Sequence, residues 1–354
     1  MMQPDNALYE MASDLFGSRC RTRDRREAEQ GAWPGALWEE IEGVALPAAL
    51  IPEQAGGYGV SATEALSVIR SAGEHAVPLP LAETMMAGWL LAKAGLGIPG
   101  GPLGVIARRE QGLTIERDGG RWAVRGSLRQ IPWGRHVPTV VTVVKINQQH
   151  HVVRLPTVDA RQDRGENIAR EPRDTLTFDV LLTDGDVAPS NISPSDVQAV
   201  GAAMRSQQIA GALSRITDMS VQYAQERKQF GRPIGKFQAI QQNLALLAAQ
   251  TAAANAAADI AAEAVSDGVD QLAIACAKVR CNEAASLAAP IAHQIHGAFG
   301  FTHEYDLHFY TKRLMSWREE FGNEVEWSAR IGEVMKRHGA DQLWASITNI
   351  GARA

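Results

Sequence analysis

Two segments of the chain, residues 223–241 and 294–305, carry the side chains best suited to holding a ligand. An arginine offers a planar set of donors for phosphate oxygens, and a phenylalanine can lie against a flat ring. Glutamine amides donate and accept hydrogen bonds, and glycines let the backbone approach a ligand closely. Taken singly, an arginine between a glutamate and a lysine, or a glutamine in an Ala-rich helix, is more typical of a solvated helix face. Taken as a set, they give six candidate binding residues: Arg227, Phe230, Gln238, Gln294, Gly297 and Gly300.

The two segments and their spacing resemble the flavin-adenine-dinucleotide (FAD) contact motifs of the acyl-CoA dehydrogenase family. The resemblance implies that the six residues hold the adenine-diphosphate half of FAD and reach it across a subunit interface. Two positions depart from the family pattern. Ala298 stands where a second glycine is usual, and Phe299 stands where asparagine is common.

The resemblance also implies a catalytic glutamate, which takes the α proton of an acyl-CoA thioester while a hydride leaves the β carbon for the flavin. Family members carry this glutamate at one of two places. Aligning from Gln294 without gaps brings Phe321 to the first place, and counting back from Arg227 brings Gly201 to the second. Neither residue has a side chain that accepts a proton, so the sequence gives no confident catalytic residue.

Glu320 is a weak candidate for a displaced base, because a shift of one residue in the loop would bring it near the first place. The alternative is that Glu319, Glu320 and Glu324 form a surface acidic cluster. Arg205, one helical turn after Gly201, is expected at the surface or in a subunit interface.

The part of the chain that would cradle the flavin ring is also altered. The family's Thr-Glu-Pro loop has no counterpart between Gly104 and Thr114. The segment 130–134 resembles the family's Trp-Ile-Thr-Asn stretch only in its tryptophan. Trp133 is therefore either a ring-stacking residue or a core or rim aromatic, and the sequence leaves both open.

The helices and strands that position these residues can be predicted from helix-breaking residues and from the spacing of hydrophobic residues. Pro-broken helical stretches give way to β-rich runs, and then to long Ala-rich helices after a capping box at Ser193–Asp196. The sequence predicts a mainly α fold with a central β domain, similar to that of the family. The predicted parts are an N-terminal helical domain, a small β domain and a C-terminal four-helix bundle with the FAD motifs and the oligomer interface: residues 1–103, 104–192 and 193–354.

The amino-acid composition argues against several classes of binding partner. The 354 residues are 45% hydrophobic and 21% charged with a net charge of −5, which is typical of a globular protein and argues against a nucleic-acid surface. Cys20, Cys276 and Cys281 are too few for a disulfide framework or a metal site. The N-terminus has no basic start or apolar run, and no uninterrupted apolar stretch approaches membrane length. We expect a cytoplasmic protein without metal or membrane partner.

Several functional hypotheses remain. In the first, the chain is an accessory FAD-binding subunit that pairs with a related catalytic chain, as in bacterial assemblies acting on steroid-derived CoA esters. In the second, it is an active homomeric acyl-CoA dehydrogenase, or a related flavoenzyme, with Glu320 as base. A purely structural helical protein would leave the two motifs unexplained. The resemblance further implies an acyl-CoA substrate, a dimer or tetramer, and electron-transfer flavoprotein as acceptor.

Overall fold

The computed structural model describes residues 6–106, 112–266 and 268–348. Within these residues the chain separates into two compact units. One unit contains Met1–Thr22, Ala62–Val77 and Ala202–Ala354, and the other contains Arg23–Ser61 and Pro78–Gly201. N-terminal helices contribute to both units, so the units do not follow the three predicted ranges. The boundaries at 103 and 192 remain predictions.

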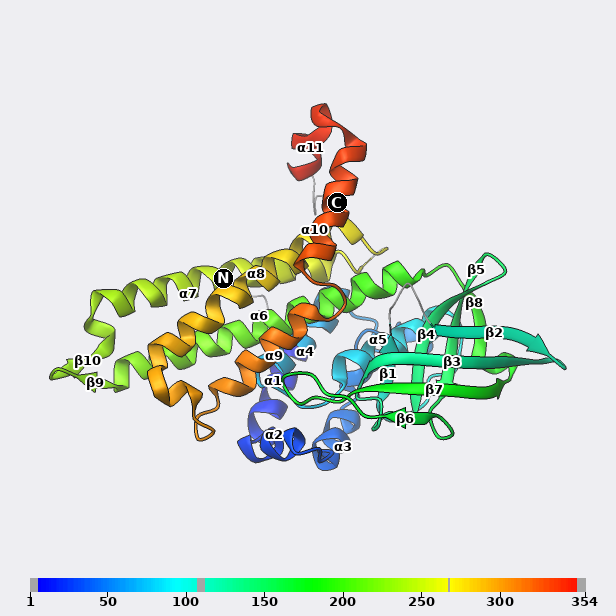
Figure 1. Ribbon diagram of the computed structural model, residues 1–354, viewed down its shortest axis with the longest axis horizontal. Helices are drawn as coiled ribbons and strands as arrows, with labels where there is room; N and C mark the ends of the chain where they lie inside the picture. The colour runs from blue at the N-terminus through cyan, green and yellow to red at the C-terminus, as the bar shows by residue number, and fades with distance from the viewer. Residues whose placement is uncertain (1–5, 107–111, 267, 349–354) are drawn as a thin grey trace. The chain divides into compact units, whose positions relative to one another are not determined.

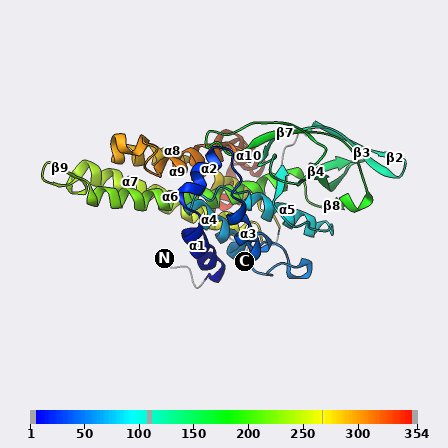
Figure 2. The same ribbon diagram turned by 90° about the horizontal axis from the view of Figure 1, so that it is seen from below.

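The first unit is helical (Figure 1). Its long helices α6 to α9 lie side by side in two perpendicular views (Figures 1 and 2), and α7 packs along α8. The helices of this unit are α1 (Ala7–Arg19), α4 (Ala62–Glu74), α6 (Pro194–Glu226), α7 (Gln238–Glu263), α8 (Gln271–His296), α9 (Leu307–Glu319), α10 (Glu324–His338) and α11 (Leu343–Thr348). The first turns of α6 extend into the second unit.

The predicted start of α6 is confirmed. The backbone N–H of Ser193 donates to Oδ2 of Asp196 (2.8 Å), and the backbone N–H of Asp196 donates to Oγ of Ser193 (3.2 Å). This reciprocal capping box satisfies N–H groups that have no partner inside the helix. Local sequence therefore fixes where the helix that carries Arg205 and Arg227 begins.

By length and composition, α7 could cross a membrane, and 33% of its most apolar stretch is buried in the fold. Core helices of soluble proteins pass the same test. From Gln238 to Ala258 the helix carries no charged residue, and Leu246 and Ile260 are exposed. The helix therefore presents an uncharged outer face.

Helices α4 and α6 cross at backbone contact through glycines. A Cβ on Gly211 would lie 2.0 Å from the carbonyl oxygen of Arg70, and a Cβ on Gly73 would lie 2.3 Å from that of Gln208. Since both obstacles are backbone atoms, neither can move aside without displacing a helix. Gly73 and Gly211 are thus required for this crossing.

We expect Gly211→Ala to lower the free energy of unfolding by about 2 kcal/mol, because overpacking outweighs the gain in helix propensity. Gly332→Ala on α10 is the matched control, since a Cβ there meets nothing within 4 Å. That variant should gain about 0.5–1 kcal/mol. Denaturant unfolding of both variants measures the difference. Equal behaviour of the two would contradict the close crossing.

The second unit contains the β domain. Within the described residues its strands form sheets ordered β1-β4-β5-β8 and β2-β3-β7-β6, antiparallel except for the β1–β4 pair. The strands are β1 (Leu103–Ile106), β2 (Gly112–Asp118), β3 (Arg121–Pro132), β4 (Thr139–Ile146), β5 (Gln149–Pro156), β6 (Arg161–Asp163), β7 (Arg173–Leu182) and β8 (Val187–Ser190). Both sheets contribute to one hydrophobic core, with Val140 and Val153 from one and Val124 and Phe178 from the other.

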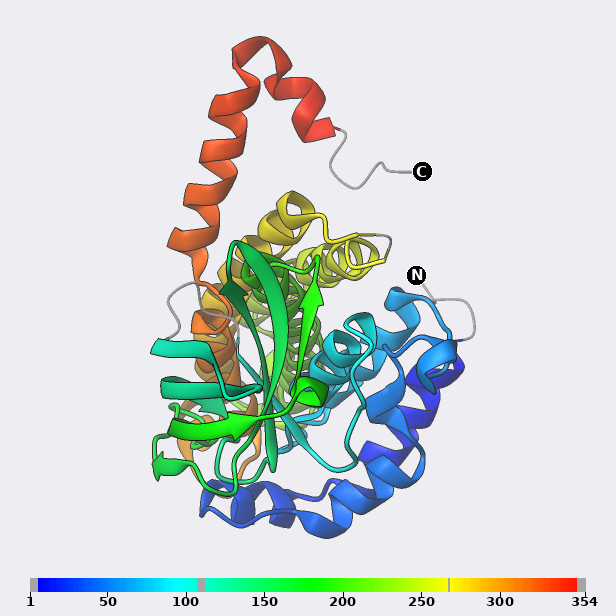
Figure 3. The ribbon, with the colours of Figure 1, turned by 90° about the vertical axis from the view of Figure 1, so that its right-hand side faces the viewer.

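Helices α2 (Thr22–Glu29), α3 (Gly35–Gly43) and α5 (Leu81–Lys93) accompany this unit. Figure 3 shows α5, in cyan, beside the strands, and α5 contacts β1 and β4. The predicted β-rich runs are confirmed: residues 122–126, 139–144, 151–154 and 175–182 lie in β3, β4, β5 and β7. Of the region between Gly104 and Thr114, residues 107–111 lie outside the described residues.

Candidate functional site

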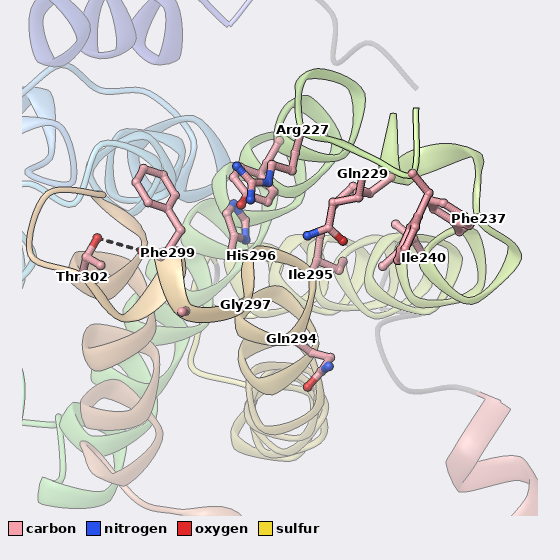
Figure 4. A pocket seen from close by; sticks show the side chains of 14 residues that line it. Arg227, Gln229, Phe237, Ile240, Gln294, Ile295, His296, Gly297, Phe299 and Thr302 are labelled. Carbon is pink, nitrogen blue, oxygen red and sulfur yellow. Dashed lines mark hydrogen bonds between the residues drawn. The ribbon is translucent and has the colours of Figure 1, made fainter. Parts of the chain in front are cut away.

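A pocket of about 860 Å³ lies in the first unit, where the two candidate segments meet (Figure 4). It lies among the end of α6, the hairpin that follows at residues 228–233, the start of α7, and the end of α8 with the 3-10 turn η5 (Gly297–Phe301). Four of the six predicted residues line it: Arg227, Phe230, Gln294 and Gly297. The structure therefore brings together segments about 60 residues apart that the sequence only pairs by resemblance.

The hairpin after α6 determines how Phe230 is presented. Strands β9 (Lys228–Gln229) and β10 (Arg232–Pro233) pair antiparallel, and the intervening Phe230 and Gly231 have φ of 51° and 77°. Positive φ at both central residues is the geometry of a tight two-residue turn. Phe230 is consequently 91% exposed at the tip, where its ring meets that of Phe237 edge-on (6.1 Å).

The side chains of Arg227 and Gln294 point in different directions. Arg227 is exposed at the foot of the hairpin, where the backbone N–H of Ile234 donates to its carbonyl (2.8 Å). In Figure 4 the amide of Gln294 points away from Arg227. Gly297 has φ of 59° where α8 ends. That left-handed value favours glycine and leaves the backbone open beside the pocket.

The remaining two predicted residues, Gln238 and Gly300, are not among those that line the pocket. Gln238 is the exposed first residue of α7. Gly300 is buried, and a Cβ there would lie 2.8 Å from Cβ of His296 and 3.2 Å from Leu307. Gly300 thus allows η5 to pack against α8 and α9. A role for either residue in binding a cofactor stays a prediction.

A second polar cluster lies between α6 and the turn after α9. Arg205 is 2% exposed, and its Nε and Nη2 both donate to Oε2 of Glu320, at 2.8 and 2.7 Å. Its Nη1 donates to Gln208, and its guanidinium lies 5.4 Å from the ring centre of Phe321. The expectation that Arg205 is a surface or interface residue is therefore wrong. Apolar packing around α6 buries the arginine within this unit.

The expected surface acidic cluster is wrong as well. The side chain of Glu320 is only 16% exposed because it faces Arg205. Glu324 forms a separate ion pair with Arg318 (2.7 Å), and Glu319 accepts a hydrogen bond from Asn323. The three glutamates are close in sequence, but each contacts a different residue.

The turn at Phe321 is held from several sides. Phe321 has φ of 54°, and its carbonyl accepts a hydrogen bond from Nε1 of the fully buried Trp327 (3.0 Å). A Cβ on Gly322 would lie 2.5 Å from that same nitrogen. Left-handed backbone at a phenylalanine costs free energy, so the surrounding contacts must maintain this turn.

Lys278 on α8 binds the last turn of α9, directly before the turn at Phe321. Its side chain is fully buried, and its Nζ donates to Oδ1 of Asn282 (2.9 Å) and to the carbonyls of Trp317 (2.6 Å) and Arg318 (3.3 Å). Those carbonyls belong to the last turn of α9, where the helix leaves oxygens without internal partners. Burial lowers the pKa of Lys278 from 10.5 to about 7.

This lowered pKa makes stability depend on pH. Between about pH 7 and pH 10.5 the unfolded chain binds a proton at Lys278 that the folded chain does not, so the free energy of unfolding should rise with pH. Relative to Lys278→Met, we expect the wild type to gain about 2 kcal/mol between pH 7 and 9. Denaturant unfolding at several pH values measures this slope. Parallel pH curves for the two proteins would show that the lysine is not titrating there.

Comparison with known proteins finds acyl-CoA dehydrogenases. Residues 199–326 match the family model described as acyl-CoA dehydrogenase, C-terminal domain. A protein named acyl-CoA dehydrogenase IpdE2, from Mycolicibacterium smegmatis, is 29% identical over 298 residues, covering 82% of this chain and 85% of that protein. The chain thus carries an acyl-CoA dehydrogenase C-terminal domain at residues 199–326, and it is similar to acyl-CoA dehydrogenases over 82% of its length.

Solved structures of the family share the fold. A steroid ACAD variant of Tcur3481-Tcur3483 has a TM-score of 0.84 at 23% identity, covering 94% of this chain and 97% of that chain. The ChsE4-ChsE5 complex from Mycobacterium tuberculosis has a TM-score of 0.84 at 19% identity, covering 96% and 99%. The predicted acyl-CoA dehydrogenase-like fold, helical at both ends with a small β domain, is thus confirmed.

Trp133 lies in the core of the β domain. It is 3% exposed, and its ring contacts Trp33 edge-on (6.0 Å) and His136 (6.0 Å) within the same unit. Of the readings that the acyl-CoA dehydrogenase resemblance left open, the structure favours the core aromatic. Trp33 lies about a hundred residues earlier in the chain, so no local pattern could reveal that it covers Trp133.

Sequence reasoning missed several residues that organise the site. Tyr223 and His296 fall within the two segments without a predicted role, and Phe299 is predicted only as a departure from the family pattern, yet all three line the pocket. Lys278 received no role, although it directly follows the apolar run 273–277 in an Ala-rich stretch, where a cation was a usable signal. A charged residue surrounded by buried positions of a helix needs a partner, and that expectation would have singled it out.

Proposed function

We propose that this chain is the accessory FAD-binding subunit of a heteromeric enzyme that α,β-dehydrogenates an acyl-CoA thioester. The observation that carries the proposal is the turn at Glu320–Gly322. It holds a phenylalanine where the family keeps its base, and its neighbouring carboxylate is bound to the buried Arg205. Gly201, the other family position for the base, has no side chain.

The pocket supports a role in holding FAD. Its features suit the adenine-diphosphate half: an exposed arginine for the phosphates, an exposed ring at Phe230, and open backbone at Gly297. When bound, the flavin supplies the acceptor for the hydride that leaves the β carbon of the acyl group. The residues of this chain then bind and orient the cofactor. The carboxylate that removes the α proton comes from the partner chain.

The partner is a related acyl-CoA dehydrogenase chain, and the outer face of α7 is the surface that meets it. This face is uncharged over five turns and exposes Leu246 and Ile260. Alanine-rich faces allow helices of two subunits to approach closely. The ChsE4-ChsE5 complex is a neighbour with two kinds of chain, and a steroid ACAD is another. We infer a steroid-derived acyl-CoA as substrate and electron-transfer flavoprotein as the acceptor of electrons.

Arg227→Ala should weaken FAD retention by about 10- to 100-fold without unfolding the protein, because one charge-assisted contact to a phosphate is lost. Lys228→Ala is the matched control. It removes the same charge from the next residue, which is exposed and is not among the residues that line the pocket. Flavin content after dialysis of the assembled protein measures retention. Identical flavin content in wild type and Arg227→Ala would remove Arg227 from the site.

Assembly is tested by expressing the chain alone and together with a related, longer acyl-CoA dehydrogenase chain. The proposal expects a stable complex of both chains with bound FAD, and an additional charge on the α7 face, as in Leu246→Glu, should disrupt it. Glu283→Gln, which changes an exposed charge on α8, should leave the complex intact. A fully loaded, active assembly of this chain alone would instead support the homomeric reading.

A further inference from the structure

A buried amine ties the end of α9 to α8. Nζ of Lys278 donates to the carbonyls of Trp317 and Arg318, and it also donates to Oδ1 of Asn282. An ammonium has three N–H groups, so these contacts use all of them, and every acceptor is a neutral oxygen. Asn282 adds to the attachment, because its Nδ2 donates to the carbonyl of Arg318 (3.1 Å). Two side chains of α8 thus satisfy carbonyls that the last turn of α9 leaves open.

The carboxylates that face Lys278 are both bound to arginines. Glu320 is paired with Arg205 and Glu324 with Arg318, each at 2.7 Å. The titratable groups that act on the lysine come from α6, α8, the turn and α10: Arg205, Cys281, Glu320 and Glu324. Helix α7, which packs along α8, is uncharged over most of its length. A protonated Lys278 is therefore a buried charge whose surroundings are already neutralised.

The turn that follows α9 lies close to solvent and is strained. Glu319, the last residue of α9, is exposed. Phe321 and Gly322 have φ of 54° and 99°, and the left-handed value costs free energy at the phenylalanine. Helix ends with solvent-exposed backbone open locally at a lower free energy than the whole fold. Opening at this place would bring water to the amine of Lys278.

We propose that Lys278 is a proton-sensitive latch for the α9–α10 junction (residues 317–324), closed when its amine is neutral and released when the amine is protonated. In the open junction the amine is hydrated and binds a proton as an exposed lysine does. In the closed junction burial lowers its pKa to about 7. Protonation therefore favours the open form, and the release takes place near neutral pH. The latch acts on the fold of this chain and does not depend on the proposed FAD site.

The test follows amide hydrogen exchange of the full-length protein by mass spectrometry, corrected for the intrinsic pH dependence of exchange. Peptides that contain residues 317–324 report on the junction, and peptides from the middle of α8 report on global unfolding. Between pH 7 and pH 8.5 the opening constant of the junction should fall by about tenfold, because closing releases one proton. In Lys278→Met, whose side chain does not titrate, the opening constant should stay the same over this range.

Lys336→Met is the matched control, since it removes an exposed lysine from α10 and should keep the pH dependence of the wild type. The same pH dependence in Lys278→Met as in wild type would overturn the latch. So would junction peptides that exchange only together with those of α8, because the lysine would then titrate through global unfolding alone. The wild type decides the matter even if Lys278→Met does not fold: an opening constant of the junction that is independent of pH contradicts the latch.

Discussion

Purified without a partner chain, the protein is expected to leave acyl-CoA esters essentially unoxidised. A positioned general base contributes about 10²- to 10⁴-fold to a proton abstraction, and this chain has a phenylalanine and a glycine at the positions where the family carries that base. Steady-state assays with short, long and steroid-side-chain CoA esters measure the rate. Adding the related catalytic chain should raise the rate by at least that factor.

Variants of the turn separate this expectation from the displaced-base reading. Glu320→Gln should leave the low rate unchanged, because both contacts from Arg205 already bind Oε2 of that carboxylate. Phe321→Glu should not restore activity in the isolated chain, since it provides a carboxylate without the ring-binding loop of the β domain. Rapid turnover by the single chain that is abolished in Glu320→Gln would show that the accessory-subunit proposal is wrong.

Arg205→Ala should lower the free energy of unfolding by about 3 kcal/mol, because breaking one side of a buried ion pair strands its partner. The double variant Arg205→Met, Glu320→Gln should lose much less, since it removes both charges and keeps the volume filled. Denaturant unfolding compares the two.

The surface pair Arg125–Asp179 provides the reference for an ion pair in water. Its side chains are 64% and 84% exposed, so Arg125→Ala should cost only about 0–1 kcal/mol. If Arg205→Ala were as mild as Arg125→Ala, the Arg205–Glu320 contact could not be what maintains the turn at Phe321. A double variant as damaging as Arg205→Ala would show that packing, and not charge, dominates there.

Much of the fold follows from local chemistry. The capping box at Ser193, the helical periods after it and the strand-rich runs before it depend on residues close in sequence, and the structure confirms each of them. The two binding motifs also have local signatures, and the family match includes both. The loss of a carboxylate at residues 201 and 321 is a matter of residue type, so no arrangement of the backbone can reverse it.

Only the tertiary structure determines which partners the polar and aromatic side chains contact. Arg205 and Glu320 are separated by 115 residues, and Lys278 and Trp317 by 39, so their pairing depends on how α6, α8 and α9 pack. The sequence predicts Arg205 at the surface or in a subunit interface because arginine is seldom buried. It does not show that the fold supplies a carboxylate that compensates for burial. The ring contacts of Phe299 arise in the same way. Ring contacts between α6 and the end of α8 have no local pattern, because they are set by side-chain packing across the bundle.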